Sequence, residues 1–170
     1  VLWMTVVSDD TREATLGVEE IVAEGTRFLE ERGFSDLHIT DVQMLRNRAT
    51  LTFVPNRQGI LRYAEPLRVQ VNAADGEIIG FWATSFFLAQ SRVQSEIVVA
   101  EQMAWNQREM VREGVEILDR KLALIQSEQQ EEVLTQRLGV QYEGDFYLIY
   151  LNVETGDEER MVKVSSPQFF

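Results

Sequence analysis

Five pairs of neighbouring carboxylates are the residues of this sequence most suited to acid–base chemistry. The pairs are Asp9/Asp10, Glu19/Glu20, Glu30/Glu31, Glu131/Glu132 and Glu158/Glu159. Enzymes that cleave glycosidic bonds hold two carboxyl groups about 5–9.5 Å apart across a cleft, with the pKa of one raised by burial. Adjacent residues on a helix or strand point in different directions. The spacing therefore favours solvated surfaces over a catalytic pair.

The other groups that could catalyse a reaction or bind a metal are few. The sequence has one histidine, His38, and no cysteine, whereas a zinc site needs several such ligands. It also lacks the Gly-x-Ser-x-Gly turn of a nucleophilic serine and the twelve-residue loop of a calcium site. We expect His38 to be a surface or half-buried strand residue, and we predict no catalytic residue, metal or cofactor.

Charge narrows the classes of partner. Sixteen basic and twenty-eight acidic residues among 170 give a formal net charge of −12. Nucleic acids and anionic membrane surfaces are polyanions, so this balance argues against both. No run of residues reaches the ~20 apolar positions of a membrane span. Most of the acidic residues are expected to cover solvated faces, and a basic partner is compatible with the charge.

Hydrophobic periodicity predicts one secure helix, in residues 17–34. Its apolar face consists of Val18, Ile21, Val22, Gly25, Phe28 and Leu29. Their i, i+3, i+4 spacing is typical of a helix that packs on one side, and Gly33 suits the position just after its end. We expect Val22, Phe28 and Leu29 to pack against strands that contain Leu51, Phe53, Val69 and Val71.

The remaining segments read as strands and one shorter helix. Residues 68–73 alternate up to a turn, and "EIIGFWATSFF" (77–87) returns as the partner strand. "PNRQG" (55–59) reads as a turn. "MAWNQREMVREG" (103–114) predicts a second helix, and "VEILDRKLALIQ" and "EEVLTQRLGVQ" predict further strands. Helix followed by antiparallel strands therefore occurs twice, which indicates an α+β fold.

Two predicted hairpins have similar sequences. "RVQVNAADGEIIGF" (68–81) and "YLIYLNVETGDEERM" (147–161) place Asn72 and Asn152, and Gly76 and Gly156, at matching positions. Asp75-Gly76 predicts a two-residue turn in which both residues have positive φ. We infer two copies of one unit, with residues 11–88 as one repeat, 89–102 as a linker and 103–170 as the second repeat.

Residues 1–10 are expected to hold the last strand of a preceding, truncated repeat. The sequence begins at Val1, inside the apolar run "VLWMTVV", which resembles "IIGFWAT" (78–84) in character. Any export signal or membrane anchor is then expected upstream.

Aromatic side chains carry the one functional signal that remains. They are Phe81, Trp82, Phe86, Phe87, Tyr147 and Tyr150. Alternation along a strand divides such residues between two faces, so some should point away from the helix. Core packing is the more common role of such residues, but tandem repeats leave faces of this kind for a neighbouring unit or a partner. We predict partner binding there.

Three segments together resemble a known family. They are "NAADGEIIGF" (72–81), "LNVETGDEE" (151–159), and "KLALI" with "EEVL" between them (121–125 and 131–134). Their order resembles the C-terminal region of the germination protein YpeB family, which consists of tandem PepSY domains. The resemblance covers nearly the whole chain and departs from the family in residues 89–106, where a short proline-containing linker is typical.

The resemblance implies tandem PepSY-like units, each a helix packed on an antiparallel β-sheet. It implies a location outside the cytoplasmic membrane of the spore, at the inner membrane or cortex, with an upstream tether. It also implies a partner, the cortex-lytic enzyme SleB. We therefore expect a non-catalytic module that binds and regulates a cell-wall hydrolase. The alternatives are a carboxylate-based cell-wall hydrolase and a purely structural spacer.

Overall fold

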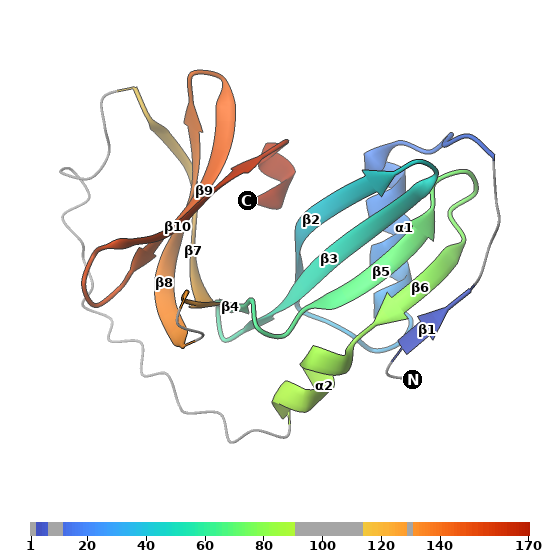
Figure 1. The fold of residues 1–170 in the computed structure, drawn as a ribbon, viewed down its shortest axis with the longest axis horizontal. Coiled ribbons are helices and arrows are strands. Elements are labelled where there is room, and N and C mark those ends of the chain that lie inside the picture. The colour runs from blue at the N-terminus through green and yellow to red at the C-terminus, as the bar shows by residue number, and fades with distance from the viewer. Residues whose placement is uncertain (1–2, 7–11, 91–113, 129–130) are drawn as a thin grey trace. The chain divides into compact units, whose positions relative to one another are not determined.

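The computed structural model describes residues 3–6, 12–90, 114–128 and 131–170 (Figure 1). The chain forms two compact units. Unit 1 comprises Val1–Gln58 and Arg62–Arg92, and unit 2 comprises Gly59–Leu61 and Val93–Phe170. The predicted second helix (103–113) and most of the predicted linker (91–102) lie outside the described residues.

Unit 1 begins with the predicted helix, α1 (Val18–Glu30). Glu20 accepts a hydrogen bond from the backbone N–H of Gly17 (2.8 Å), and the two glutamates of the first turn lie at the positive end of the helix dipole. Gly33 follows the helix with φ 80°, and the N–H of Phe34 returns to the carbonyl of Leu29 (3.0 Å). These local interactions explain where the helix begins and ends.

The sheet of unit 1 is antiparallel, and α1 packs on one of its faces (Figure 1). Its strands lie in the order β1, β6, β5, β3, β2. Their bounds are β1 Trp3–Thr5, β2 Leu37–Leu45, β3 Arg48–Arg57, β5 Leu67–Asn72 and β6 Ile78–Trp82. Alternation along β3 and β5 turns one set of side chains toward α1 and the other set away from it.

The core of unit 1 lies between α1 and this sheet. Phe28 and Leu29 are buried, as predicted, against Leu51 and Val69, and Val22 is partly buried at the margin. Gly25 allows the close approach of helix and sheet, because a Cβ at this position would meet the Leu51 side chain. The sequence-based core is therefore confirmed, with Ile21 as an additional, fully buried member.

Unit 2 is built on four antiparallel strands in sequence order. They are β7 Glu116–Gln126, β8 Glu132–Tyr142, β9 Asp145–Asn152 and β10 Glu158–Val164. A short strand, β4 (Ile60–Arg62), lies next to β7, and its residues Ile60 and Leu61 are buried. The 3₁₀ turn η1 (Pro167–Phe169) follows β10. The predicted α+β class is confirmed.

The two sheets correspond strand by strand. The pairing of β2 with β3 has a bulge between Ile39 and Asp41, and that of β7 with β8 has one between Ile117 and Asp119. A second register shift recurs as well. It lies between Gln70 and Val71 in the pairing of β5 with β6, and between Glu158 and Arg160 in the pairing of β9 with β10. Bulges bend a strand and fix its register, so their recurrence aligns β2, β3, β5 and β6 with β7, β8, β9 and β10.

Three sequence-based predictions about unit 1 are wrong in detail. β6 ends at Trp82, and the residues after it form a short helix, α2 (Thr84–Gln90), so that Phe86 and Phe87 lie on a helix. The helix brings both rings within reach of Phe34, a contact that an extended strand would not provide. Residues 89 and 90, which were predicted to begin the linker, also belong to this helix. Pro55 lies within β3, and the chain turns instead at Gln58 and Gly59, both with positive φ.

The predicted two-residue turn at Gly76 is also incorrect. Gly76 alone among the central residues has positive φ (79°), and its N–H bonds to the carbonyl of Asn72 four residues earlier (2.8 Å). The Asn72 side chain accepts a further bond from the N–H of Ala74 (3.0 Å). The asparagine therefore shapes a longer loop than an Asp-Gly pair would form.

Candidate functional site

The six aromatic residues predicted to bind a partner occupy different environments. Phe81 on β6 and Tyr150 on β9 are each 3% exposed and belong to the two cores. Trp82, Phe86 and Tyr147 are half-buried, and Phe87 on α2 is 36% exposed. The Tyr147 hydroxyl group donates a long hydrogen bond, 3.5 Å, to the Asp145 carboxylate. The four accessible residues thus belong to three separate elements, and only Phe86 and Phe87 contact each other.

A cluster of five phenylalanines connects the core of unit 1 with its surface; its members are Phe28, Phe34, Phe81, Phe86 and Phe87. Phe34 lies at the centre, with ring centroids 5.7 Å from Phe81, 5.4 Å from Phe86 and 6.1 Å from Phe87. The arrangements are edge-on or tilted, which aromatic quadrupoles favour. The cluster therefore holds α2 and its two rings in a defined position.

The outer end of this phenylalanine cluster is apolar and exposed. Phe87 is followed by Leu88, which is 59% exposed. Beside them, the Arg57 guanidinium lies 5.6 Å from the ring centroid of Phe86 and pairs with the buried carboxylate of Glu65 at 2.6 Å. An exposed aromatic side chain on a rigid support is typical of the anchor residues of protein interfaces.

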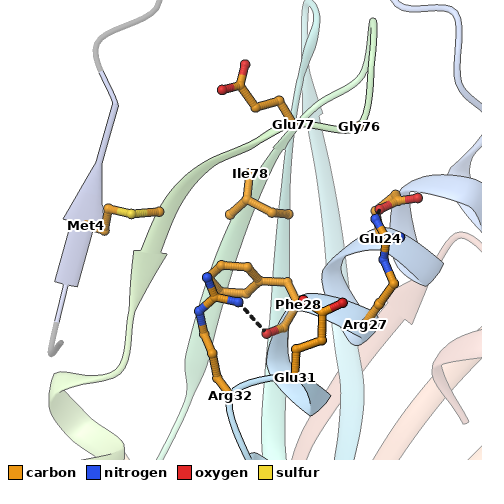
Figure 2. A pocket seen from close by; sticks show the side chains of 9 residues that line it. All are labelled: Met4, Glu24, Arg27, Phe28, Glu31, Arg32, Gly76, Glu77 and Ile78. Carbon is orange, nitrogen blue, oxygen red and sulfur yellow. Dashed lines mark hydrogen bonds and ion pairs between the residues drawn. The ribbon is translucent and has the colours of Figure 1, made fainter.

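A cavity of about 330 Å³ lies between α1, β1 and β6 (Figure 2). Met4, Phe28 and Ile78 supply its apolar side chains. The Arg32 guanidinium lies 3.6 Å over the Phe28 ring and donates to the Phe28 carbonyl (3.1 Å). Arg27 forms an ion pair with Glu24 on the same helix. Three of the charged residues in its lining, Glu24, Arg27 and Arg32, are therefore already engaged.

The repeated hairpin loops hold the same backbone bonds in both units. In each loop the glycine N–H donates to the asparagine carbonyl, at 2.8 Å for Gly76 and 2.9 Å for Gly156. The asparagine N–H donates to the residue five positions later, at 2.8 Å in both loops. The Asn152 side chain accepts from Glu154 as Asn72 accepts from Ala74. The sequence repeat thus specifies one loop geometry.

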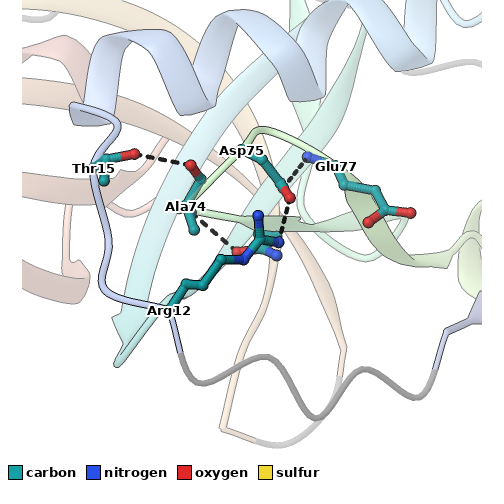
Figure 3. Close-up of polar contacts among 6 residues, drawn as sticks. Arg12, Thr15, Ala74, Asp75 and Glu77 are labelled. Carbon is teal, nitrogen blue, oxygen red and sulfur yellow. Dashed lines mark hydrogen bonds and ion pairs between the residues drawn. The ribbon is translucent and has the colours of Figure 1, made fainter.

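The loop of unit 1 is also fastened to the segment before α1 (Figure 3). Arg12 donates to Asp75 at 2.5 Å, and the Thr15 hydroxyl donates to the Ala74 carbonyl at 2.8 Å. Asp75 in turn accepts from the N–H of Glu77 (3.0 Å). Asp75 therefore has a structural role, since its carboxylate organises the turn and anchors the preceding segment.

Unit 2 contains a buried charge that sequence reasoning missed. Arg137 on β8 is fully buried; it donates to Asp119 (2.9 Å) and to the Phe169 carbonyl (3.3 Å). Burial alone would raise the pKa of Asp119, but hydrogen bonds and charges from Lys121 and Arg137 outweigh burial and lower it. A lowered pKa suits a structural ion pair and is the opposite of what a general acid requires.

The available signal for Asp119 was its place two residues after an isoleucine, as Asp41 follows Ile39. The signal for Arg137 was a charge inside an otherwise apolar, alternating strand.

Within the described residues, no three His, Asp or Glu side chains gather in a way that could hold a metal ion. His38 is half-buried on β2, in the type of position that was expected. No helix in the described part of the chain is long and apolar enough to cross a membrane.

Comparison with known proteins gives one consistent result. Residues 1–95 match the family model for YpeB sporulation, PepSY1 and PepSY2 domains. The chain is 26% identical to sporulation protein YpeB of Halalkalibacterium halodurans over 92% of its length, and 28% identical to that of Bacillus subtilis over 83%. It spans about a third of these relatives, 34% and 31% of their lengths respectively.

A solved structure shares the fold. The Bacillus megaterium YpeB C-terminal domain superposes with a TM-score of 0.84 and 24% sequence identity. The match covers 97% of this chain and 72% of that one. The fold of this chain is therefore one that is already known.

Proposed function

Because the chain belongs to the YpeB sporulation family, we propose that it is a non-catalytic module that binds and regulates a spore cortex-lytic enzyme of the SleB type. It acts outside the cytoplasmic membrane of the spore, where such an enzyme meets its substrate. Binding holds the enzyme stable, in place or inactive until it is needed.

The observation that best supports this proposal is the exposed end of the phenylalanine cluster. Phe87 and Leu88 project from a short helix whose position is fixed by Phe34 and Phe86. A partner that covers this surface buries apolar area without having to order it first, which lowers the entropic cost of association. Tyr147 of unit 2 and Trp82 of unit 1 are accessible enough to contribute to additional partner surfaces.

The experiment is a binding measurement between this chain and the purified cortex-lytic enzyme, with wall digestion assayed in parallel. Phe87→Ala is expected to weaken binding at least about tenfold, whereas the matched variant Met161→Ala should leave it unchanged. Met161 is 52% exposed and lies on β10 in unit 2, so it reports on exposed apolar area in general. Equal loss in both variants, or no effect of the chain on the enzyme's activity, stability or location, would contradict the proposal.

Salt dependence separates the two contributions to binding. Acidic side chains at the rim of the contact are expected mainly to govern the association rate and to be screened by salt, whereas the buried aromatic ring governs dissociation. Binding should therefore weaken modestly at high salt and persist.

The alternative function, a carboxylate-based hydrolase, predicts that the purified chain turns over wall polymer and that replacing a single Asp or Glu abolishes this turnover. Turnover of that kind would overturn the non-catalytic assignment.

A further inference from the structure

The face of the unit 1 sheet that points away from α1, here called the helix-free face, carries an ordered set of aromatic and polar side chains. Trp3, Trp82, Arg68 and Thr52 are consecutive cross-strand neighbours on β1, β6, β5 and β3. Directly opposed residues of antiparallel strands lie on the same face of a sheet. The next row on this face contains Gly80, Gln70 and Thr50 in the same strand order.

Trp82 packs over Gly80 on this face, because the glycine has no side chain to occupy that space. A Cβ added at Gly80 would meet the outer edge of the indole, with Trp82 Cζ3 only 2.7 Å away. One edge of the indole therefore lies over Gly80, and the Trp82 side chain is half-buried. Trp3, its neighbour on β1, is 65% exposed. Directly opposed residues of antiparallel strands have Cβ atoms about 5 Å apart, so Trp3 and Trp82 lie on neighbouring strands at this face and are here called the aromatic platform.

Polar groups that can form new hydrogen bonds surround the platform. Arg68 is exposed and, among the residues that the structure describes, forms no ion pair. Gln70 is half-buried and donates one long bond, 3.4 Å, to the hydroxyl of Thr50. A guanidinium with five donors and an amide with donors and an acceptor therefore lie beside two aromatic rings.

Unit 2 shows how the same face looks when a peptide covers it. Gly139 and Leu148 correspond to Thr52 and Arg68 by strand pairing, and Phe170 lies directly over Gly139. Leu148 is buried there, and Phe170 also contacts Phe146 at 5.9 Å between ring centroids. A glycine hollow and an aliphatic floor receive an aromatic peptide side chain. The helix-free face of unit 1 has neither at these positions.

From this chemistry we propose that the helix-free face binds a polysaccharide strand of β-linked pyranose rings that carries carboxylate groups. Pyranose rings expose apolar C–H faces that stack on flat aromatic side chains, while their hydroxyl groups need many donors and acceptors. Adjacent strands are about 4.8 Å apart, close to the length of one pyranose unit, so consecutive rings can meet Trp3, Trp82 and then Arg68. Arg68 would pair with a single carboxylate as a local cation, whereas the net charge of −12 disfavours a densely charged polyanion.

The test is titration of this chain with two soluble probes, followed by tryptophan fluorescence and calorimetry. One probe is a tetramer of N-acetylglucosamine, which is neutral, and the other is a muramic-acid-containing glycan strand, which carries carboxylates. Both should bind, the second more tightly. Trp82→Ala should weaken both at least about tenfold, or about 1.4 kcal/mol. Arg68→Ala should weaken the carboxylate-bearing probe alone.

Two further variants keep the test decisive if Trp82→Ala folds poorly. Trp3→Ala changes an exposed residue on a short edge strand and should weaken both probes. Leu118→Ala removes an apolar side chain of unit 2 that is 42% exposed and should change neither affinity. Absence of binding by the unaltered chain, or affinities unchanged in Trp82→Ala and Trp3→Ala, would overturn the proposal. Loss of a protein partner in these variants without glycan binding would assign the face to that partner.

Discussion

Unit 1 and unit 2 share strand order, bulges and hairpin loop, but they cover the sheet differently. Unit 1 packs α1 on one face and leaves Trp82 and Arg68 accessible on the other. Unit 2 uses the face equivalent to that second one to bury Arg137 beneath the segment that ends in Phe169 and Phe170. One sheet architecture thus supports two surfaces with different chemistry, because side chains on alternate positions can change without disturbing the backbone pairing.

Removal of Arg137 should have the largest effect in unit 2. Arg137→Ala leaves Asp119 and the Phe169 carbonyl without their buried partner, which should cost about 3–5 kcal/mol of unfolding free energy. Arg137→Met fills most of the volume without the charge and should cost less. Urea unfolding measures both. No measurable cost in either variant would show that the ion pair is irrelevant to the closure of this face, whereas equal costs would assign the whole effect to the lost ion pair.

The corresponding core substitution in unit 1 is destabilising because it leaves an empty space where a side chain was packed. Phe28→Ala removes a ring that is 7% exposed and contacts Phe81 at 5.5 Å, which should cost about 3–5 kcal/mol. Phe87→Ala, from the exposed end of the same cluster, should cost less than about 1 kcal/mol. Thermal and urea unfolding distinguish them. A Phe28→Ala melting temperature within about two degrees of the unaltered chain would contradict the core assignment.

The two equivalent loops should differ in how much unfolding free energy is lost when their asparagine is replaced. Asn72 is 1% exposed, so Asn72→Ala buries unsatisfied backbone groups and should cost about 1–3 kcal/mol. Asn152 is half-buried, and water can replace part of its bonding, so Asn152→Ala should cost about 0.5–1.5 kcal/mol. Amide hydrogen exchange of the loop N–H groups would locate the loss. A larger cost in unit 2 would reverse the expected order.

The smallest expected effect is a pH dependence confined to unit 2. The pKa of Asp119 is lowered from its ordinary value of 3.8, so its carboxylate form stabilises the folded state. This contribution is complete above that value and is lost as the pH falls through the lowered pKa. Unfolding free energies measured from about pH 6 to 2 should fall less steeply in Asp119→Asn. Identical slopes would argue against a role for the ion pair.

The sequence was sufficient for features that depend on near neighbours. The i, i+3, i+4 spacing around Phe28 predicted α1, and alternation around Leu51 predicted β3. It was insufficient for residues 84–90, where phenylalanines that favour strands lie on a helix because Phe34 packs against them. Local preference there was weaker than tertiary packing.

The candidate surfaces follow the same division. The list of aromatic residues came from the sequence, but their exposure depended on distant partners, and burial removed Phe81 and Tyr150 from the accessible set. Trp3 lacked a signal of its own, because its importance arises from its pairing with Trp82 across β1 and β6.

By itself, the sequence determined the repeated loop, because an asparagine and a glycine four residues apart supply the side-chain acceptor and the positive φ that this loop requires. Only the tertiary structure decided which sheet face is covered. In β8 and β9 apolar residues occur on both alternations, Leu138 on one face and Leu148 on the other. Such a strand can be covered on either side, and contacts from residues far along the chain, here Phe169 and Phe170, select the side.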